Sequence, residues 1–438
     1  MSEIKVNLVS PRSGTTVTLG EAGDTIALGA CASSTGFGIT GITWCTTAKT
    51  AAFCAASGSG YLVNTTSTAF TATLPASPTV GDQVSFVDFA GTFDSNALTL
   101  GRNSKKIKGA CKCATVEADR GAITIIYTGT TQGWITTSQA NDGTMTQAEF
   151  VTATGGSPST GAIDGDYKVH SFTGDGCLVV SAAGNASGST TIDYLVIAGG
   201  GGGGRGQGVT DQKGGGGGAG GYLASYPNPA TGGFPVSATT YPITIGGGGT
   251  AGGPSGSGKG CNSIFSTVTT TGGGGGGDNN PSRFNGQPGG SGGGENAAGG
   301  VGGTGNTPPA SSPSNPVQGF DGGIGSSAPA AGGGGGGGAS AIGGCGATAT
   351  GGAGGAGFTS TISGSPVARG GGGGGGAGGA GGIATSGGGN GSGCSPCAAA
   401  VAGTVNTGGG GGAGGSCTGS SNGAAGGSGL VVIRYKFQ

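Results

Sequence analysis

The stretch Asp193–Gly206, DYLVIAGGGGGGRG, joins a short apolar run directly to a row of glycines. It matches the GxGxxG template in several ways, which raises the hypothesis of a dinucleotide-binding turn. Such a turn needs a helix straight after the glycines, so that the pyrophosphate meets the helix N-terminus, and an acidic residue about 20 positions on. The continuation GRGQGVTDQKGGGGGAGGYL cannot sustain a helix, because each glycine costs about 1 kcal/mol relative to alanine. The acidic residue is also missing, so we expect no dinucleotide cofactor here.

A second glycine motif, GPSGSGKG at Gly253–Gly260, matches the GxxxxGK part of a phosphate-binding loop. In that loop the next position must hold a serine or threonine that binds magnesium, and here it holds Gly260. The following residues, CNSIFSTVTT, are β-branched and favour a strand over a helix. In a chain so rich in glycine, both motifs are expected by chance. We therefore predict no cofactor.

The composition limits the class of protein further. Glycine accounts for 117 of 438 residues with only 18 prolines, and runs such as Gly332–Gly338 break the three-residue period of collagen. Charged residues make up 8% and the net charge is −1, so no basic patch favours nucleic acid. No window approaches twenty apolar residues, and we expect no membrane insertion. The opening MSEIKVNLVSPRSG lacks the features of a secretory signal.

Residues 1–137 have an ordinary glycine content and a β pattern. In Phe70–Leu74 and Ile123–Thr128, apolar and polar residues alternate as on a half-buried strand. Turn clusters such as LPASPTVGD separate further short runs, and helix formers are scarce. Several short strands at close spacing favour a β-sandwich or a small barrel. We predict an N-terminal β-module over residues 1–138, with a role in assembly or attachment.

The rest of the chain divides into a connector and a glycine-rich domain. We predict the connector over residues 139–165, with a short helix at Asp142–Phe150, because TGGSPSTGAIDGD has linker composition. The glycine-rich domain is expected over residues 166–438. Apolar strands at Ile192–Ala198 and Leu430–Tyr435 bracket it, which argues against a flexible tether. The predicted fold class is all-β.

Glycine runs of this length suit the extended helix with three residues per turn. Glycine has no Cβ, so such polyglycine II helices can pack closely with nothing projecting between them. Each helix lacks internal hydrogen bonds, and every buried N–H and C=O must find a partner on a neighbouring run. We therefore predict a domain of packed polyglycine II helices, held together by many mutually supporting runs.

Several motifs resemble those of glycine-rich virion proteins. DYLVIAGGGGGG, the repeated GGGGGAGG blocks and the closing GGSGLVVIRYKF are similar to the C-terminal region of marine bacteriophage tail-fibre proteins. The packed polyglycine helices are similar to those of the tail-tip adhesins of T-even-type phages, and resemble the glycine-rich extracellular domain of the anaplastic lymphoma kinase group. ATLPASPTVGDQVSFVDFAGTFDSNALTLGRN and IIYTGTTQGW likewise resemble a β-module of phage fibre and appendage proteins.

Residues able to carry catalysis or bind metal are few. His170, the only histidine, lies in a strand pattern, and we interpret it as a satisfied sheet residue. The close cysteine pairs Cys111/Cys113 and Cys394/Cys397 do not make a zinc site, although a local disulfide at the second pair stays open. We expect most of the eleven cysteines to be small buried residues. A calcium site also stays open, at three aspartates in turn segments: Asp164, Asp166 and Asp175.

Candidate binding residues lie in the loops between glycine runs, since the runs offer only backbone. Arginine and aromatic residues are the usual anchors of recognition. The loop DNNPSRFNGQPG carries Arg283 and Phe284, and NTPPASSPSNPVQGF ends at Phe320. We predict these three as receptor-binding residues, with Tyr222, Tyr226 and Phe234 as secondary candidates. The alternative is that the loops are solvated connectors.

The resemblance implies a function outside catalysis. It implies a tail fibre of a phage virion, synthesised in the host bacterial cytoplasm, that contacts other virion proteins and recognises a host glycan or outer-membrane protein. A homotrimer is expected. The alternative is a structural head fibre or capsid decoration without a receptor role. A third possibility, a depolymerase, is disfavoured by the lack of catalytic residues, and we expect no enzyme.

Overall fold

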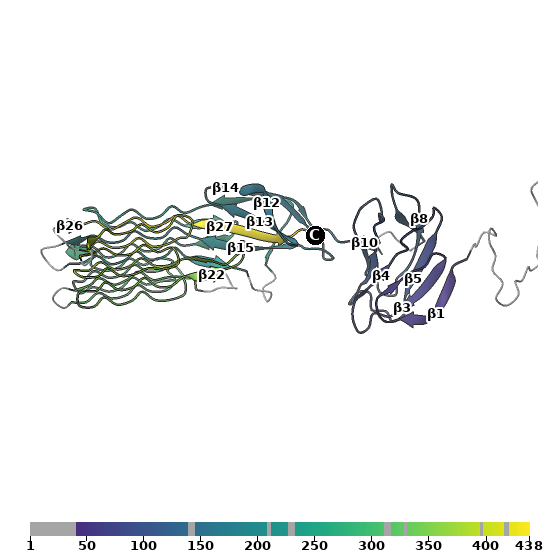
Figure 1. The fold of residues 1–438 in the computed structure, drawn as a ribbon, viewed down its shortest axis with the longest axis horizontal. Helices are drawn as coiled ribbons and strands as arrows, with labels where there is room; N and C mark the ends of the chain where they lie inside the picture. Colours follow the sequence, from purple (N-terminus) through teal and green to yellow (C-terminus); the bar gives the residue numbers. More distant parts are fainter. Residues whose placement is uncertain are drawn as a thin grey trace, which may run out of the picture. The chain divides into compact units, whose positions relative to one another are not determined.

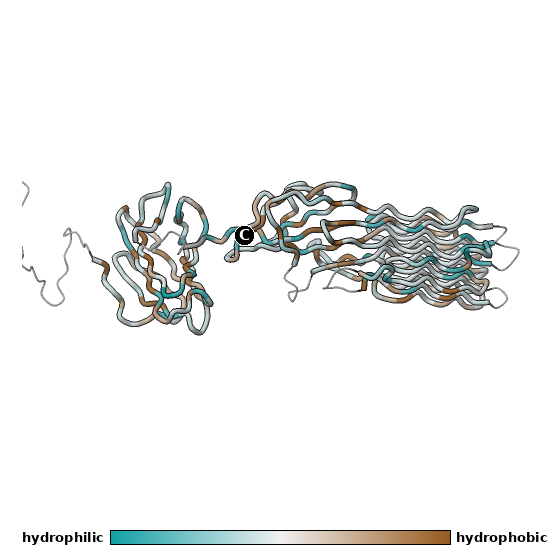
Figure 2. The backbone as a smooth tube through the Cα atoms, turned by 180° about the vertical axis from the view of Figure 1, so that it is seen from behind, coloured by the Kyte–Doolittle hydropathy of each residue, from teal (hydrophilic) through white to brown (hydrophobic). Residues whose placement is uncertain are grey.

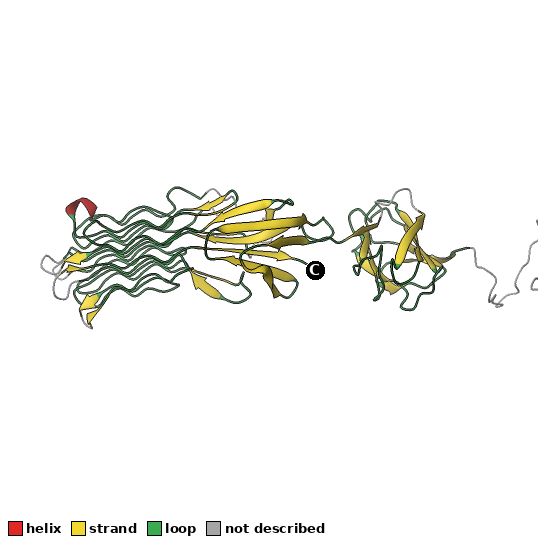
Figure 3. Ribbon diagram, turned by 90° about the horizontal axis from the view of Figure 1, so that it is seen from above, coloured by secondary structure: helices red, strands yellow, loops and turns green. Residues whose placement is uncertain are grey.

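The computed structural model describes residues 41–138, 145–207, 212–226, 233–310, 317–327, 331–394, 397–415 and 420–438. The chain divides into two compact units, Met1–Thr146 and Gln147–Gln438. Within the described residues the regular elements are β-strands, apart from the single-turn 3-10 helix η3 (Pro281–Arg283) (Figure 3). The predicted all-β fold class is therefore confirmed. No helix in this part of the chain is long and apolar enough to cross a membrane.

Unit 1 is a sandwich of two five-stranded sheets (Figure 1). The first sheet contains, in order, β1 (Thr43–Lys49), β3 (Ser59–Val63), β5 (Gln83–Asp88), β8 (Ala122–Tyr127) and β9 (Trp134–Ser138). The second contains β10 (Met145–Gln147), β7 (Ala114–Val116), β6 (Leu98–Gly101), β4 (Phe70–Thr73) and β2 (Phe53–Cys54). Strands β1, β3 and β5 are parallel, as are β2, β4 and β6, so the chain alternates between the sheets before antiparallel strands complete both.

The core of unit 1 follows the alternation in the sequence. Ile123, Ile125 and Tyr127 of β8 are buried, and the residues between them are only half-buried. The ring of Tyr127 packs on the fully buried Trp134, with 5.4 Å between the ring centroids. Because burying apolar surface contributes roughly 25 cal/mol per Å², the alternation fixes which face of each strand turns inward.

Unit 2 begins with a second sandwich, whose paired strands are antiparallel. One sheet contains β11 (Val151–Thr154), β14 (Gly176–Ala183), β19 (Thr240–Thr244), β20 (Ser263–Phe265) and β21 (Val268–Thr270). The other contains β12 (Ser157–Asp164), β13 (Tyr167–Phe172), β27 (Leu430–Lys436), β15 (Thr191–Ile197) and β17 (Tyr222–Ala224), and β18 (Phe234–Pro235) also pairs with β15.

Strand β27, from the end of the chain, lies in the middle of its sheet. It pairs with β13 on one side and with β15 on the other. Val431, Ile433 and Tyr435 pack into the core between the two sheets, whereas Leu430 and Val432 belong to a second cluster on the opposite face. A strand covered on both faces needs apolar residues in succession, which is why LVVI is continuous.

The glycine runs extend from this sandwich side by side and are mostly pale in hydropathy (Figures 1 and 2). In the run 199–204, N–H groups three residues apart donate to the same neighbouring run, at 2.8 to 3.0 Å. The acceptors lie in 258–261 for Gly199 and Gly202, in 424–427 for Gly200 and Gly203, and in 215–218 for Gly201 and Gly204. This period of three is the signature of a polyglycine II helix.

In the part of the lattice that the structure describes, the interior run 199–204 has hydrogen-bonded neighbours on six sides. The carbonyls of run 199–204 accept hydrogen bonds from residues in 249–252, 273–276 and 411–414, which are not the runs to which its N–H groups donate. Every backbone donor and acceptor of the run therefore has a partner, as a buried backbone requires. Short strand pairs and turns join the runs at the lattice ends: β16 (Gly206–Gln207) with β26 (Ser420–Ser421), β22 (Phe358–Ser360) with β23 (Val367–Arg369), and β24 (Gly393–Cys394) with β25 (Cys397–Ala398).

Two expectations for the middle of the chain need correction. The range 139–165, expected as a connector, contains β11 and β12, both part of the unit 2 sandwich. In β11, Val151 and Ala153 are buried and alternate with exposed threonines. This alternation covers only four residues, and the glycine, serine and proline that follow it have the composition of a linker. The helix expected at Asp142–Phe150 is also absent from its described part, since Met145–Gln147 forms β10.

Candidate functional site

The predicted binding residues lie at opposite ends of the glycine lattice. Arg283 belongs to η3, which follows the run leading away from β21 along residues 271–278. Phe320 comes two residues after Gln318, whose side chain accepts from the Thr271 N–H at the start of that run. At 3.1 Å per residue, the run separates the two ends by roughly 20 Å. The structure therefore does not bring Arg283 and Phe320 into one site.

At the end of the lattice away from the sandwich, Arg283 fastens two loops together. Its Nε forms an ion pair with Asp278 at 3.1 Å, and Nη1 and Nη2 donate to the carbonyls of Ser255 and Pro254 at 2.6 and 3.1 Å. The Asp278 carboxylate is almost fully buried and also accepts from the Asn280 N–H at 2.8 Å. The guanidinium thus positions the loop. Asp278 was missed in the sequence, although it lies five residues before Arg283 in the same loop.

Phe284 is the predicted anchor that this loop presents. Its carbonyl accepts from Asn296 at 2.9 Å, which fixes its backbone to the lattice, while the residue itself is only half-buried. The flanking Ser282 and Asn285 are exposed. An aromatic ring on a fixed backbone loses little conformational entropy on contact with a partner. Phe320, at the other end of the lattice, is 36% exposed.

The three secondary candidates lie in and beside the sandwich. Tyr222, in β17, is 5% exposed and its ring packs against Phe358, so it is not available as a surface anchor. Phe234, in β18, packs against Phe265 with 5.1 Å between ring centroids. Tyr226 packs at the edge of the second cluster, where the Thr361 hydroxyl donates to its hydroxyl group. The apolar surface of these three residues stabilises the fold. They were expected in exposed loops, and the structure places them in packed positions instead.

Parts of the predicted binding loops lie outside the described residues. This applies to residues 311–316 of the loop that ends at Phe320. In the described remainder, loops gather at both ends of the lattice (Figure 3). This clustering is the arrangement expected of loops presented by a rigid scaffold.

A family model described as a glycine-rich domain matches residues 180–436, which is more than half of the chain. The chain belongs to this glycine-rich domain family. The match begins within β14 and ends with β27, so it takes in the lattice together with most of the sandwich. No curated protein matched the sequence.

In β13, His170 is fully buried and both of its ring nitrogens are hydrogen-bonded. Nδ1 lies 2.7 Å from the carbonyl oxygen of Gly155, an acceptor only, so Nδ1 carries the proton. Nε2 lies 3.1 Å from the hydroxyl of Tyr435. Burial lowers the pKa of His170, and the charge of Lys168 adds to this, against the opposing effect of the Gly155 bond. The prediction of a satisfied sheet histidine is confirmed.

Two of the three candidate calcium residues are held by other partners. Asp164 pairs with Arg434, and Asp175 accepts from the Ile245 N–H at 2.8 Å. Across the described ranges, no group of three or more histidine, cysteine, aspartate or glutamate residues could hold a metal ion.

The cysteines are not buried as expected. Cys45 and Cys394 are half-buried, and the other cysteines in the described part of the chain are exposed. Cys45, Cys54, Cys111 and Cys113 belong to unit 1, and Cys177 lies in β14 of the second sandwich. Cys394 and Cys397 are direct partners in the β24–β25 hairpin.

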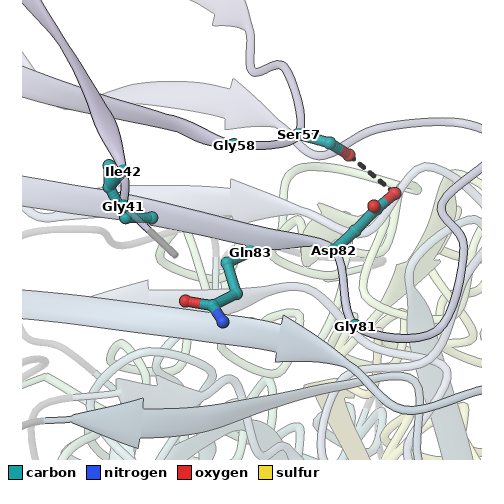
Figure 4. Close-up of a pocket in the computed structure, with 7 residues that line it drawn as sticks. All are labelled: Gly41, Ile42, Ser57, Gly58, Gly81, Asp82 and Gln83. Carbon is teal, nitrogen blue, oxygen red and sulfur yellow. Dashed lines mark hydrogen bonds between the residues drawn. The ribbon is translucent and has the colours of Figure 1, made fainter. Parts of the chain in front are cut away.

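A small pocket of about 220 Å³ lies at the end of the first sheet of unit 1 (Figure 4). The carboxylate of Asp82 turns toward Ser57, whose hydroxyl donates to it at 2.8 Å, and it also accepts from the Thr79 N–H at 2.9 Å. Burial raises the pKa of Asp82, but these bonds outweigh burial and lower it overall. Both carboxylate oxygens are thus committed to the turn. We assign this aspartate a structural role.

Proposed function

We propose that the protein is a virion appendage of a bacteriophage, a tail fibre that recognises the host through loops displayed at the free end of its glycine lattice. The observation that carries this proposal is the loop around η3. Arg283 fastens it to the lattice and Phe284 stands half-exposed beside it. The lattice supplies rigidity and the loop supplies the side chains. The receptor is a host glycan or outer-membrane protein, and the fibre is a homotrimer on the virion.

The experiment compares the half-buried Phe284 with an exposed apolar side chain at the opposite end of the lattice. Phe284→Ala should lower adsorption of the purified protein to its host cells at least tenfold, because aromatic anchors carry about 2 kcal/mol or more of binding. Ile342→Ala is the matched control: Ile342 is 66% exposed and lies near the sandwich, next to the turn that follows Ala339. Adsorption of the control should equal that of the wild type.

The alternative, a structural protein without a receptor role, predicts that adsorption does not depend on the η3 loop. If the chain is a head fibre or capsid decoration, replacing residues 279–285 by glycine and serine leaves adsorption unchanged, provided that circular dichroism shows the domain folded. That result would overturn the receptor-binding proposal. Immunogold labelling of intact virions separates the two locations directly.

A further inference from the structure

A polar depression of about 360 Å³ lies at one end of the sheet that contains β27, away from the η3 loop. Tyr167, Asp193, Arg434 and Lys436 come from three different strands, and the loop 185–191 completes the rim. Its size falls at the lower end of the range for small-molecule sites, about 300–1,000 Å³. Strand pairing brings these residues together, because Asp193 is the direct register partner of Arg434.

Arg434 is the central residue of this pocket. It is 8% exposed, forms an ion pair with Asp164, and its guanidinium lies 4.3 Å from the ring centroid of Tyr167. Its Nε is buried and has no hydrogen-bond partner in the part of the chain that the structure describes. This Nε is closed to solvent and therefore also to a ligand, and a ligand would contact the part of the guanidinium that lines the pocket.

Asp193 supplies the matching acceptor. One carboxylate oxygen accepts from the Ser225 hydroxyl at 2.8 Å. Burial raises the pKa of Asp193, against the opposing effects of the Ser225 bond and the charge of Arg434. Hydroxyl groups of Ser189, Thr190 and Thr191 continue the rim. Each of them can donate or accept.

The charges around the pocket balance. Arg434 and Lys436 are positive, and Asp193 in the lining and Asp164 behind Arg434 are negative. A free anion would meet the carboxylates and a free cation would meet the basic groups, so neither gains a net attraction. A neutral ligand with many hydroxyl groups can use the donors and acceptors together. Tyr167 is 36% exposed and adds aromatic surface to the pocket.

We propose that this pocket binds a neutral saccharide unit. Arg434 donates to a sugar hydroxyl, Asp193 accepts from one, and Tyr167 packs against the ring. The site is separate from the η3 loop, so it does not depend on the receptor role proposed for that loop.

The test uses the full chain and glucose, galactose, mannose and N-acetylglucosamine as probes, with saturation-transfer NMR and calorimetry as readouts. At least one sugar should bind the wild type. Asp193→Asn is nearly isosteric and keeps an acceptor for Ser225, so it should fold, and Tyr167→Ala changes an exposed residue. Both should weaken that binding at least tenfold. Val179→Ala, which changes an exposed apolar residue of β14 in the opposite sheet, should bind as the wild type does.

Three outcomes would overturn the proposal. The first is that none of the four sugars binds. The second is a bound sugar whose affinity is the same in Asp193→Asn and Tyr167→Ala, both shown folded by thermal melting. The third is that inorganic phosphate or sulfate competes for the site, which would make it an anion site. None of these outcomes bears on adsorption through Phe284, so the two proposals fail separately.

Discussion

At the scale of single residues, the glycine lattice depends on the absence of side chains at defined positions. A Cβ added to Gly217, in the interior, would lie 2.1 Å from the carbonyl oxygen of Gly201. A Cβ on Gly247, in an outer run, would meet nothing within 4 Å. The same residue type is therefore essential at one position and replaceable at another. Position in the lattice makes the difference.

This contrast gives a matched pair of variants. Gly217→Ala should lower the free energy of unfolding of the glycine-rich domain by about 3 kcal/mol, since the obstructing atoms belong to backbone that is hydrogen-bonded on all sides. Gly247→Ala should be neutral or raise it by about 0.4–1 kcal/mol, because alanine restricts the unfolded chain. Chemical denaturation followed by circular dichroism measures both. Equal stability of the two variants would contradict the lattice geometry.

His170 gives the domain a dependence on pH. Its pKa is lowered in the folded state, so the unfolded state takes up a proton that the folded state resists. This group should have little effect above pH 6.5 and should reduce stability as the pH falls below that value. His170→Gln should flatten the fall in melting temperature between pH 7 and pH 5. The pKa values of Asp193 and Glu295 are raised, so these groups favour the folded state as the pH falls. Their effect is the same in the wild type and in His170→Gln, and it cancels when the two are compared. An unchanged slope in the variant would refute the assignment.

At the scale of elements, an outer run of the lattice has one inward face and two outward ones. In the run 246–252, Gly246, Gly249 and Gly252 are buried and their N–H groups donate inward, to Ser263, Gly200 and Gly203 respectively. The four residues between them are exposed. This pattern follows from three residues per turn. In a β-strand, by contrast, buried and exposed residues would alternate with a period of two.

Amide exchange should therefore show a period of three along this run. Gly246, Gly249 and Gly252 should exchange slowly, at rates close to those of the interior run 199–204, because exchange at these positions requires the lattice to open. The residues between them should exchange quickly. Residue-resolved hydrogen exchange by NMR or mass spectrometry measures this. Uniformly fast exchange over 199–204 and 246–252 would show that the lattice does not hold in solution.

At the scale of the whole molecule, each of the two units has a core of its own. The core of unit 1 contains the buried Trp134 and comes from residues close in sequence. The core of unit 2 needs both ends of its sequence, because β27 lies between β13 and β15. Between β15 and β27 the chain builds the lattice, so the strands that bracket the glycine runs also close the domain around them. The recognition surfaces proposed above are presented by this closed domain.

Much of the fold could be predicted from local pattern. Alternation located β8 and β4, an unbroken apolar run located β15 and β27, and the lack of side chains in the glycine runs indicated polyglycine II helices. The loop of Arg283 and Phe284 stands out because arginine and aromatic residues are rare in the glycine-rich region, and its role in binding stays a prediction. In each case the signal lies within a few neighbouring residues, since backbone period and side-chain type act locally.

Only the tertiary structure decided which segments are neighbours. Glycine runs have no side chains that could distinguish one neighbouring run from another, so run length, turns and the sandwich at their base set the packing. Asp193 and Arg434 are paired across neighbouring strands although most of the sequence of unit 2 lies between them. The only local sign of this pairing is an arginine within an apolar strand. Tyr222 has the sequence character of a surface anchor but is buried, because the burial of a side chain depends on what packs over it. The sequence determined the kinds of element, and the long-range hydrogen bonds and packing determined their arrangement.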